Sequence, residues 1–377
     1  MPDDPRQDRR DPAPPRLDAR KVVLTLVLAV IGVVAMVALF GRIAGVGRLL
    51  KAWREAEHAW LPVGVAGLVL AYAGYLLAYR DLARARGGPV LSYPVVGRVV
   101  ALGFGATVVG SGAGGLAVDF WALHRAGLPV HESVRRVLAL NTLEWGVLGA
   151  MAAGAGAVTL VADRDGGVAG MGLGWLVTVP VCVLAAAWVS SPRRAARLSA
   201  VPPPPPSSPD GTERLARGTR RALRVALADA IGGVVVARGI LAQAPRHLAG
   251  LAGYPLYWIG NLIVLASAVR AFGGHLAIPS LVLAFASAMV ASALPLPAGG
   301  SGGIEAALAL TLNAAGLQID AAVLAALAFR GITFWLPMIP ALIILPTLRG
   351  LGAALDRTAQ GVPPRSDPRP VEGVEAG

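Results

Sequence analysis

The residues best placed to do chemistry in this sequence are acidic side chains that follow clusters of glycine. Glu305 stands two residues after the pair Gly302 and Gly303, and Asp119 stands four residues after Gly115. Both acids lie within long apolar stretches, where a charged side chain costs about 2.5–3.5 kcal/mol or more and usually marks a pathway or an ion pair. A helix that begins after such a turn also presents unpaired N–H groups that favour an anion. These patterns predict a polar binding site inside an apolar protein.

The role of Glu305 has two interpretations. An acid in the first turn of a helix stabilises the helix dipole by about 0.3–1 kcal/mol, and that role needs no ligand. Alternatively, Glu305 pairs with Arg330 or contacts a cationic group of a substrate. Arg330 lies nine residues after Ala321, too deep in an apolar segment for a loop charge, although its long side chain could still reach the membrane interface.

A second set of polar residues occupies comparable places earlier in the chain. Asp119, Asn141 and Glu144 all lie in or beside apolar runs, so we expect them to share a site. None is expected to be catalytic. The candidate substrate-binding residues are Gly112, Gly114, Gly115, Asp119, Asn141, Glu144, Gly299, Gly300, Gly302, Gly303, Glu305 and Arg330.

The elements that position these residues are membrane-length apolar runs. Hydrophobic residues make up 55% of the 377 and charged residues 15%, with a mean hydropathy of +0.63, whereas a soluble protein is about one quarter charged. About 20 apolar residues cross a bilayer as a helix. The sequence therefore predicts an all-α integral membrane protein, a polytopic helical bundle. The expected spans are residues 22–41, 60–79, 134–161, 168–190, 251–269 and 321–348.

Other classes of function find little support. The formal charge of +12 comes from arginines placed as the positive-inside rule requires, so no nucleic-acid partner is expected. Cys182 is the only cysteine and the five histidines are scattered, which predicts no metal site. The stretch "GSGAGG" at 110–115 matches a dinucleotide fingerprint, but that fingerprint requires alternating strands and helices. No cofactor is expected.

The apolar sequence divides into two halves, residues 21–190 and 222–350. Between them, residues 191–221 form a linker rich in proline and arginine, which we expect in the cytoplasm. The flanking segments 1–20 and 351–377 lack an apolar period and are expected to be disordered tails.

Both halves repeat one pattern of glycine cluster, acid, short apolar helix and Ala-Gly-Leu. The copies read "GSGAGGLAVDFWALHRAGLPVHESV" and "AGGSGGIEAALALTLNAAGLQIDAAV". A chance match in a chain rich in Ala, Gly and Leu is the alternative to the duplication that we favour. Glycine and proline interrupt helices, and a bilayer tolerates irregular backbone only where protein or a wet cavity surrounds it. We therefore expect two re-entrant helical hairpins, at about residues 95–125 and 279–315, that enclose a polar cavity between them.

The charges of the two Ala-Gly-Leu connectors predict opposite orientations. The first connector carries Arg125, Arg135 and Arg136, whereas the second carries no lysine or arginine. The positive-inside rule places the first in the cytoplasm and the second outside, which gives the inverted repeat common in secondary transporters. This requires residues 213–244 to lie along the interface, as their arginines at helical spacing indicate. If that segment crosses the membrane, the repeats are parallel.

The motif of the second half resembles that of a known membrane family. The stretch "PAGGSGGIEAAL", followed by "FRGITFWLP", is similar to the lysylphosphatidylglycerol synthase transmembrane (flippase-like) family, and the likeness covers residues 21–349. It adds Thr333 and Trp335 to the candidate site and implies that the chain moves a lipid between leaflets. Two features depart from the family: no aminoacyltransferase domain follows Leu348, so synthesis is not expected, and the first copy reads "GGLAVDFWALH" where more basic residues would be expected.

The leading hypothesis is a protein that is not an enzyme and translocates a lipid or lipid-linked headgroup across a bacterial plasma membrane. Its N-terminus, linker and C-terminus would face the cytoplasm. One alternative is a non-transporting scaffold or regulator of cell-envelope lipid synthesis. A third hypothesis is a membrane-embedded lipid transferase that uses Asp119 and Glu305 as acid and base.

Overall fold

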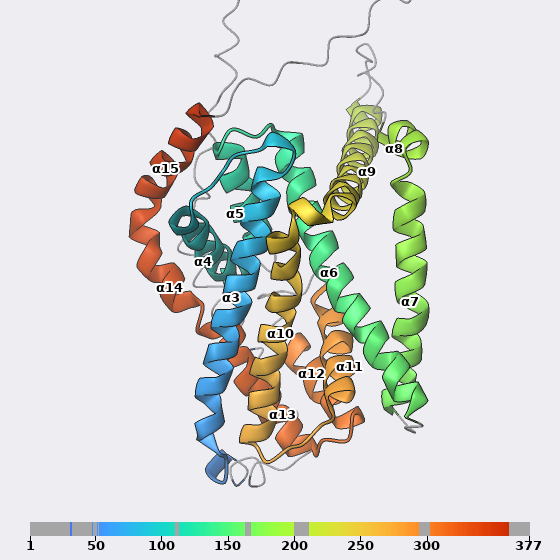
Figure 1. The fold of residues 1–377 in the computed structure, drawn as a ribbon, viewed down its shortest axis with the longest axis vertical. Coiled ribbons are helices and arrows are strands. Elements are labelled where there is room, and N and C mark those ends of the chain that lie inside the picture. Colours follow the sequence, from blue (N-terminus) through green and yellow to red (C-terminus); the bar gives the residue numbers. More distant parts are fainter. Residues whose placement is uncertain are drawn as a thin grey trace, which may run out of the picture.

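The computed structural model describes residues 53–109, 113–162, 167–199, 211–293 and 302–361, together with Ile31, Gly47 and Lys51. Within these residues all regular structure is helical (Figure 1). The longer helices are α3 (Leu61–Arg84), α6 (Val130–Val161), α7 (Gly167–Val189), α9 (Gly211–Ala242) and α10 (Leu248–Ala271). The shorter helices are α4 (Tyr93–Val109), α5 (Ala113–Arg125), α8 (Pro192–Ser199), α11 (Ile278–Met289), α12 (Gly303–Ala314), α13 (Ile319–Arg330), α14 (Met338–Ile344) and α15 (Leu348–Gln360).

Six segments of the described chain are long and apolar enough to cross a membrane. They contain the predicted spans 60–79, 134–161 and 251–269, most of 168–190, and 321–344 of the span 321–348. The sixth is Ala222–Ala242, which was not among the predicted spans; the predicted span 22–41 lies outside the described residues apart from Ile31. Large apolar side chains are exposed along α7, as lipid-facing helices require. The chain is a multi-pass membrane protein.

The centre of the fold is the pair of long helices α3 and α10, which lie side by side in Figure 1. Glycines allow the two backbones to approach closely. A β-carbon at Gly67 would come within 2.8 Å of the Gly260 carbonyl oxygen, and one at Gly74 within 2.5 Å of the Gly253 oxygen. The pairing order is reversed along the two helices, so they run antiparallel. Small residues at such a contact are the usual basis of helix association in membranes.

Each of these long helices is followed by a hairpin of short helices. Helices α4 and α5 have 17 and 13 residues and pack together, as do α11 and α12 with 12 residues each. At a rise of 1.5 Å per residue these lengths are about 18–25 Å, less than the hydrocarbon core of about 30 Å. The helices of both predicted hairpins are therefore present. The tips, 110–112 and 294–301, lie outside the described residues, and the re-entrant placement stays a prediction.

The two halves have separate apolar cores. One core consists mainly of residues of α3, α4, α5 and α6, and the other of residues of α10, α11, α12 and α13. In Figure 1, α6 begins at the upper end of the molecule, after the first Ala-Gly-Leu connector, whereas α13 begins at the lower end, after the second. The inverted repeat itself stays a prediction.

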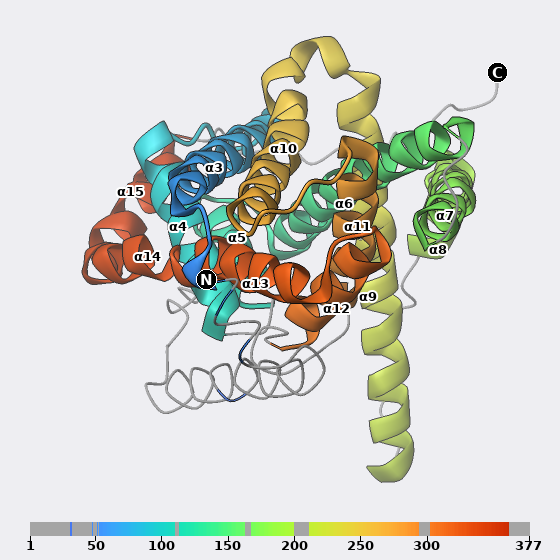
Figure 2. The same cartoon turned by 90° about the horizontal axis from the view of Figure 1, so that it is seen from below.

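Helix α9 has a direction of its own. In Figure 1 it is foreshortened while α3, α7 and α10 run vertically, and in Figure 2, turned by 90°, it is seen along its full length. It therefore crosses those helices at a steep angle, as a helix in the interface would. Its segment Ala222–Ala242 is nevertheless apolar enough to span a membrane, a test of length and composition that takes no account of direction.

Parts of the predicted linker and of the predicted C-terminal tail are helical. Within the linker 191–221, residues of α8 and the first turns of α9 are helical, and the polyproline stretch lies outside the described residues. Within the tail 351–377, residues up to Gln360 belong to α15. Leu351 and Leu355 are fully buried against α4 and α5. Helix α15 was not predicted from the sequence. Its apolar residues recur at helical spacing, but over too short a stretch to resemble a membrane span.

The arginines of the first connector are ion-paired in the structure. Arg125 donates to the carboxylate of Asp356 on α15, which fastens that helix to the end of α5. Arg136 is buried, with 0% of its surface exposed, and donates to the backbone carbonyls of Leu82 and Ala85 at the end of α3. Its guanidinium also bonds Glu132 at 3.1 Å. Arg136 therefore stabilises the fold as well as contributing positive charge.

Candidate functional site

The predicted pairing of Glu305 with Arg330 is present in the structure. Arg330 Nε donates to Glu305 Oε1 at 2.9 Å. The Glu305 side chain is fully buried and that of Arg330 is 11% exposed. The guanidinium carbon of Arg330 also lies 4.0 Å from the centre of the Phe334 ring, a favourable cation–π contact. The acid and the base of the second half are thus neutralised by each other.

Glu305 also caps the helix on which it lies. The backbone N–H of Gly302 donates to Glu305 Oε2 at 2.7 Å, directly before α12 begins at Gly303. Gly302 has a φ of 87°, in the left-handed region where glycine is favoured. Both interpretations of Glu305 therefore hold together: one oxygen caps α12 and the other binds Arg330. An anion at this helix N-terminus would have to displace the carboxylate.

The segment that follows Arg330 forms a π-helical turn, Gly331–Trp335. Such turns are rare and frequently occur at functional sites. Thr333 Oγ1 donates to the Phe329 carbonyl oxygen at 2.8 Å, and Trp335 is half-buried and contacts the edge of the Phe334 ring. The turn places Phe334 beneath the guanidinium of Arg330. Thr333 and Trp335 thus belong to the turn that follows Arg330, where they contact the Phe329 carbonyl group and the Phe334 ring.

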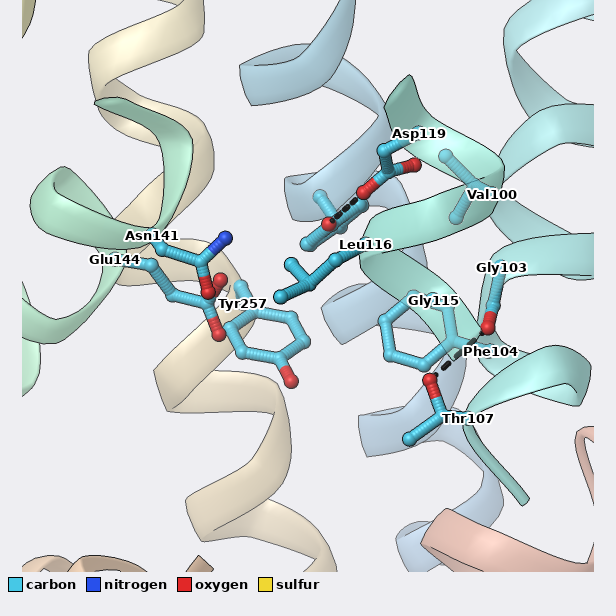
Figure 3. A pocket seen from close by; sticks show the side chains of 11 residues that line it. Val100, Gly103, Phe104, Thr107, Gly115, Leu116, Asp119, Asn141, Glu144 and Tyr257 are labelled. Carbon is cyan, nitrogen blue, oxygen red and sulfur yellow. Dashed lines mark hydrogen bonds between the residues drawn. The ribbon is translucent and has the colours of Figure 1, made fainter. Parts of the chain in front are cut away.

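The polar residues of the first half line a pocket with a volume of about 190 Å³ (Figure 3). Five helices form its walls: α3, α4, α5, α6 and α10. Figure 3 shows Asn141 and Glu144 together on one helix, facing the helix that carries Asp119. The lining residues are Tyr75, Val100, Gly103, Phe104, Thr107, Gly115, Leu116, Asp119, Asn141, Glu144 and Tyr257. The pocket is polar at several points, and none of the described residues that line it is a lysine, arginine or histidine.

Asp119 is the most enclosed acid of this pocket. It is 2% exposed, and its Oδ2 accepts a hydrogen bond of 2.8 Å from the hydroxyl of Tyr75. Tyr79 donates to its backbone oxygen at 3.0 Å. Its other carboxylate oxygen, Oδ1, accepts no hydrogen bond from the described part of the chain. It lies beside Gly103, where a β-carbon would stand 3.7 Å from it.

Asn141 and Glu144 reach the pocket from α6. The amide of Asn141 donates to the Val137 carbonyl oxygen at 3.0 Å, which leaves its own side-chain oxygen available. Trp258 donates to the backbone oxygen of Glu144 at 2.7 Å and so fixes α6 against α10. No hydrogen bond or ion pair from the described residues reaches the Glu144 carboxylate.

The glycines of the first cluster have a packing role where the structure describes them. A β-carbon at Gly114 would overlap the carbonyl oxygen of Ala106 on α4, and one at Gly115 would come within 2.6 Å of Thr107 Oγ1. Glycine at these positions therefore lets α5 lie directly on α4. Gly112, Gly299 and Gly300, which we also expected at the site, lie outside the described residues.

The structure thus brings together only part of the candidate set. Asp119, Asn141 and Glu144 share one pocket, as predicted, but Glu305 and Arg330 do not line it. The expected single cavity between the hairpins is not seen among the described residues. Tyr75 and Tyr257 also line the pocket but were not predicted from the sequence. The spacing of tyrosines along α3 was a signal for Tyr75, because Tyr75 and Tyr79 lie one helical turn apart.

The described residues contain no group of three or more His, Cys, Asp and Glu side chains that could bind one metal ion together.

Comparison with known proteins assigns the chain to a family. No curated protein matches the chain. The family described as the lysylphosphatidylglycerol synthase TM region matches residues 22–341, which include both hairpins and all the candidate residues. The chain therefore belongs to the lysylphosphatidylglycerol synthase TM region family.

Proposed function

We propose that the protein translocates a lipid or a lipid-linked headgroup between the leaflets of a membrane, as a transporter and not as an enzyme. The observation that carries the proposal is the pair of short hairpins, α4–α5 and α11–α12, each attached to a long helix of opposite direction. Interrupted helices in inverted repeats are a common framework of secondary transporters. Membership of a family named for the synthase of a lipid supports a lipid substrate.

In this proposal the hairpins are re-entrant and enter the membrane from opposite sides. The end that carries Arg125 and Arg135 faces the cytoplasm of a bacterial plasma membrane, together with the linker and both termini, because arginine-rich connectors stay inside. One half rocks against the other about the glycine contact of α3 with α10 and so opens the polar interior to each side in turn. The direction of α9 supports this arrangement, because an interfacial α9 lets the two halves have opposite topology.

The polar groups have different parts in this proposal. Glu305 and Arg330 stabilise the second hairpin, since each neutralises the other and Glu305 already occupies the amide of Gly302. The headgroup passes the glycine-rich tips of the hairpins. The pocket that contains Asp119 and Glu144 keeps acidic groups accessible inside the first half.

The test is lipid movement in vesicles that contain the purified protein. Fluorescent phospholipids with anionic, zwitterionic or cationic headgroups are placed in both leaflets, and a membrane-impermeant quencher reports the fraction that reaches the outer leaflet with time. We expect faster movement of at least one headgroup class than in empty vesicles or in vesicles with heat-inactivated protein. Equal rates for every class would refute the proposal. The scaffold hypothesis would then be tested by deleting residues 200–210 in cells.

A further inference from the structure

We infer that the pocket lined by Asp119 and Glu144 binds a monovalent cation, a proton or Na⁺, and that the gradient of this cation drives the lipid movement. The inference rests on the proposed function and adds an energy source to it. Four observations carry it: the charges of the wall, the unsatisfied oxygen of Asp119, the contrast with the second half, and the size of the pocket.

The described wall of the pocket contains two acidic side chains and no basic one. Its ionisable acids are Asp119 on α5 and Glu144 on α6, and the remaining polar groups are oxygen-bearing side chains or carbonyls. Tyr75 approaches from α3, Tyr257 from α10, and Thr107, which is not ionisable, from α4. Hard cations prefer carboxylate, carbonyl and hydroxyl oxygens. The chemistry of the wall is therefore that of a cation site.

One carboxylate oxygen of Asp119 has no hydrogen-bond partner among the described residues. One oxygen accepts from Tyr75, whereas Oδ1 is buried and accepts nothing from the described residues. A buried polar atom left without a partner is unfavourable, and a buried charge is more so, unless it is paired or neutralised. A bound proton would remove the buried charge of Asp119, and a bound Na⁺ would balance that charge and provide the missing partner of Oδ1. Either cation would therefore make the buried carboxyl group less unfavourable.

The second half provides an internal comparison. Glu305 is also buried and acidic, but both of its oxygens have partners, Arg330 and the Gly302 amide. The equivalent acids of the first half, Asp119 and Glu144, face a pocket in place of an arginine. Among the described residues, Glu305 is thus closed by a cation of the protein itself, whereas Asp119 and Glu144 are open to an external cation.

The size of the pocket favours a small occupant. Its volume of about 190 Å³ is below the range of about 300–1,000 Å³ for sites that enclose drug-sized ligands. A space of this size suits water molecules or one ion with part of its hydration shell. A complete lipid headgroup would have to bind elsewhere.

The experiment measures lipid movement in vesicles under three conditions. One has no ion gradient, one has a Na⁺ gradient at equal pH, and one has a pH gradient without Na⁺; a potassium ionophore with equal potassium on both sides holds the voltage at zero. We expect one of the two gradients to change the net rate by about 5- to 150-fold, the usual range of coupling between two bound ligands. The gradient that changes the rate of lipid movement identifies the bound cation.

Asp119→Asn and Glu144→Gln remove the acids with little change of shape. We expect the ratio of the rates with and without the effective gradient to fall to about one in each variant, as for a ligand with no differential binding. Asp320→Asn is the matched control. Asp320 lies in the first turn of α13, outside the pocket, and its Oδ1 accepts from the Ala321 N–H. The ratio of this variant should equal that of the wild type.

The possible outcomes separate the inference from the proposed function. A rate of lipid movement that is the same with and without each gradient would overturn the inference but not the transporter proposal. An unchanged ratio in Asp119→Asn would also overturn it. Absence of any lipid movement would overturn both. If a variant fails to fold, infrared difference spectra of the wild-type protein test cation binding directly. The spectra are recorded on acidification and on Na⁺ addition, and an absence of carboxyl signals in both would refute cation binding.

Discussion

Removing Arg330 should destabilise the protein far more than removing the whole ion pair. In Arg330→Met the Glu305 carboxylate stays fully buried and keeps only the Gly302 amide as a partner. Two unit charges about 4 Å apart attract each other by about 4 kcal/mol at an effective dielectric constant of 20. Breaking buried ion pairs in other proteins costs about 3–5 kcal/mol. We therefore expect Arg330→Met to lower the free energy of unfolding by about 3–5 kcal/mol.

The double variant Glu305→Gln/Arg330→Met should recover most of this loss. It leaves no charge at this site, and the glutamine oxygen can still accept from the Gly302 amide, so a residual loss of about 1 kcal/mol is expected. Glu305→Gln alone should be less harmful than Arg330→Met, because Arg330 keeps its contact with the Phe334 ring and is 11% exposed. The order of the three variants is thus fixed by the geometry.

The assay is reversible unfolding in detergent, followed by tryptophan fluorescence and far-ultraviolet circular dichroism. All three variants are compared with the wild type in one double-mutant cycle, which isolates the interaction between the two side chains. If the losses of the single variants simply add in the double variant, the two residues do not interact and the reasoning is refuted.

Three further predictions concern the contacts that assemble the fold. Gly74→Ala should lower the free energy of unfolding by about 1–3 kcal/mol because its β-carbon meets backbone atoms of α10, whereas Gly146→Ala, with no atom within 4 Å, should be neutral or stabilising in a thermal unfolding assay. Arg136→Met should cost at least about 3 kcal/mol, seen as a lower yield of folded protein in size-exclusion chromatography, because it leaves buried carbonyl groups unpaired. Asp356→Ala should raise the rate of tryptic cleavage at Arg357 by up to about fivefold, the equivalent of one exposed ion pair; an unchanged rate would show that this pair does not hold α15.

Much of the fold could be predicted because its signals are local. Residues 60–79 and 251–269 are apolar for the length of a bilayer, so their helices follow from composition alone. The hairpins were predicted from glycine and proline near the middle of apolar runs, since these residues interrupt helices wherever they occur. Helix α15 was missed because its burial depends on Leu351 and Leu355 meeting α4 and α5, a contact between distant parts of the chain.

For the candidate site, the sequence by itself determined which side chains are costly to bury. Asp119, Glu144, Glu305 and Arg330 lie within apolar sequence, so each had to find a partner or a wet pocket, whatever the arrangement of helices. Only the tertiary structure decided which of them met. Arg330 reaches Glu305 because α13 packs beside α12, whereas no arginine reaches Asp119 or Glu144 among the described residues. That difference depends on distances between helices, which residue spacing along one helix does not specify.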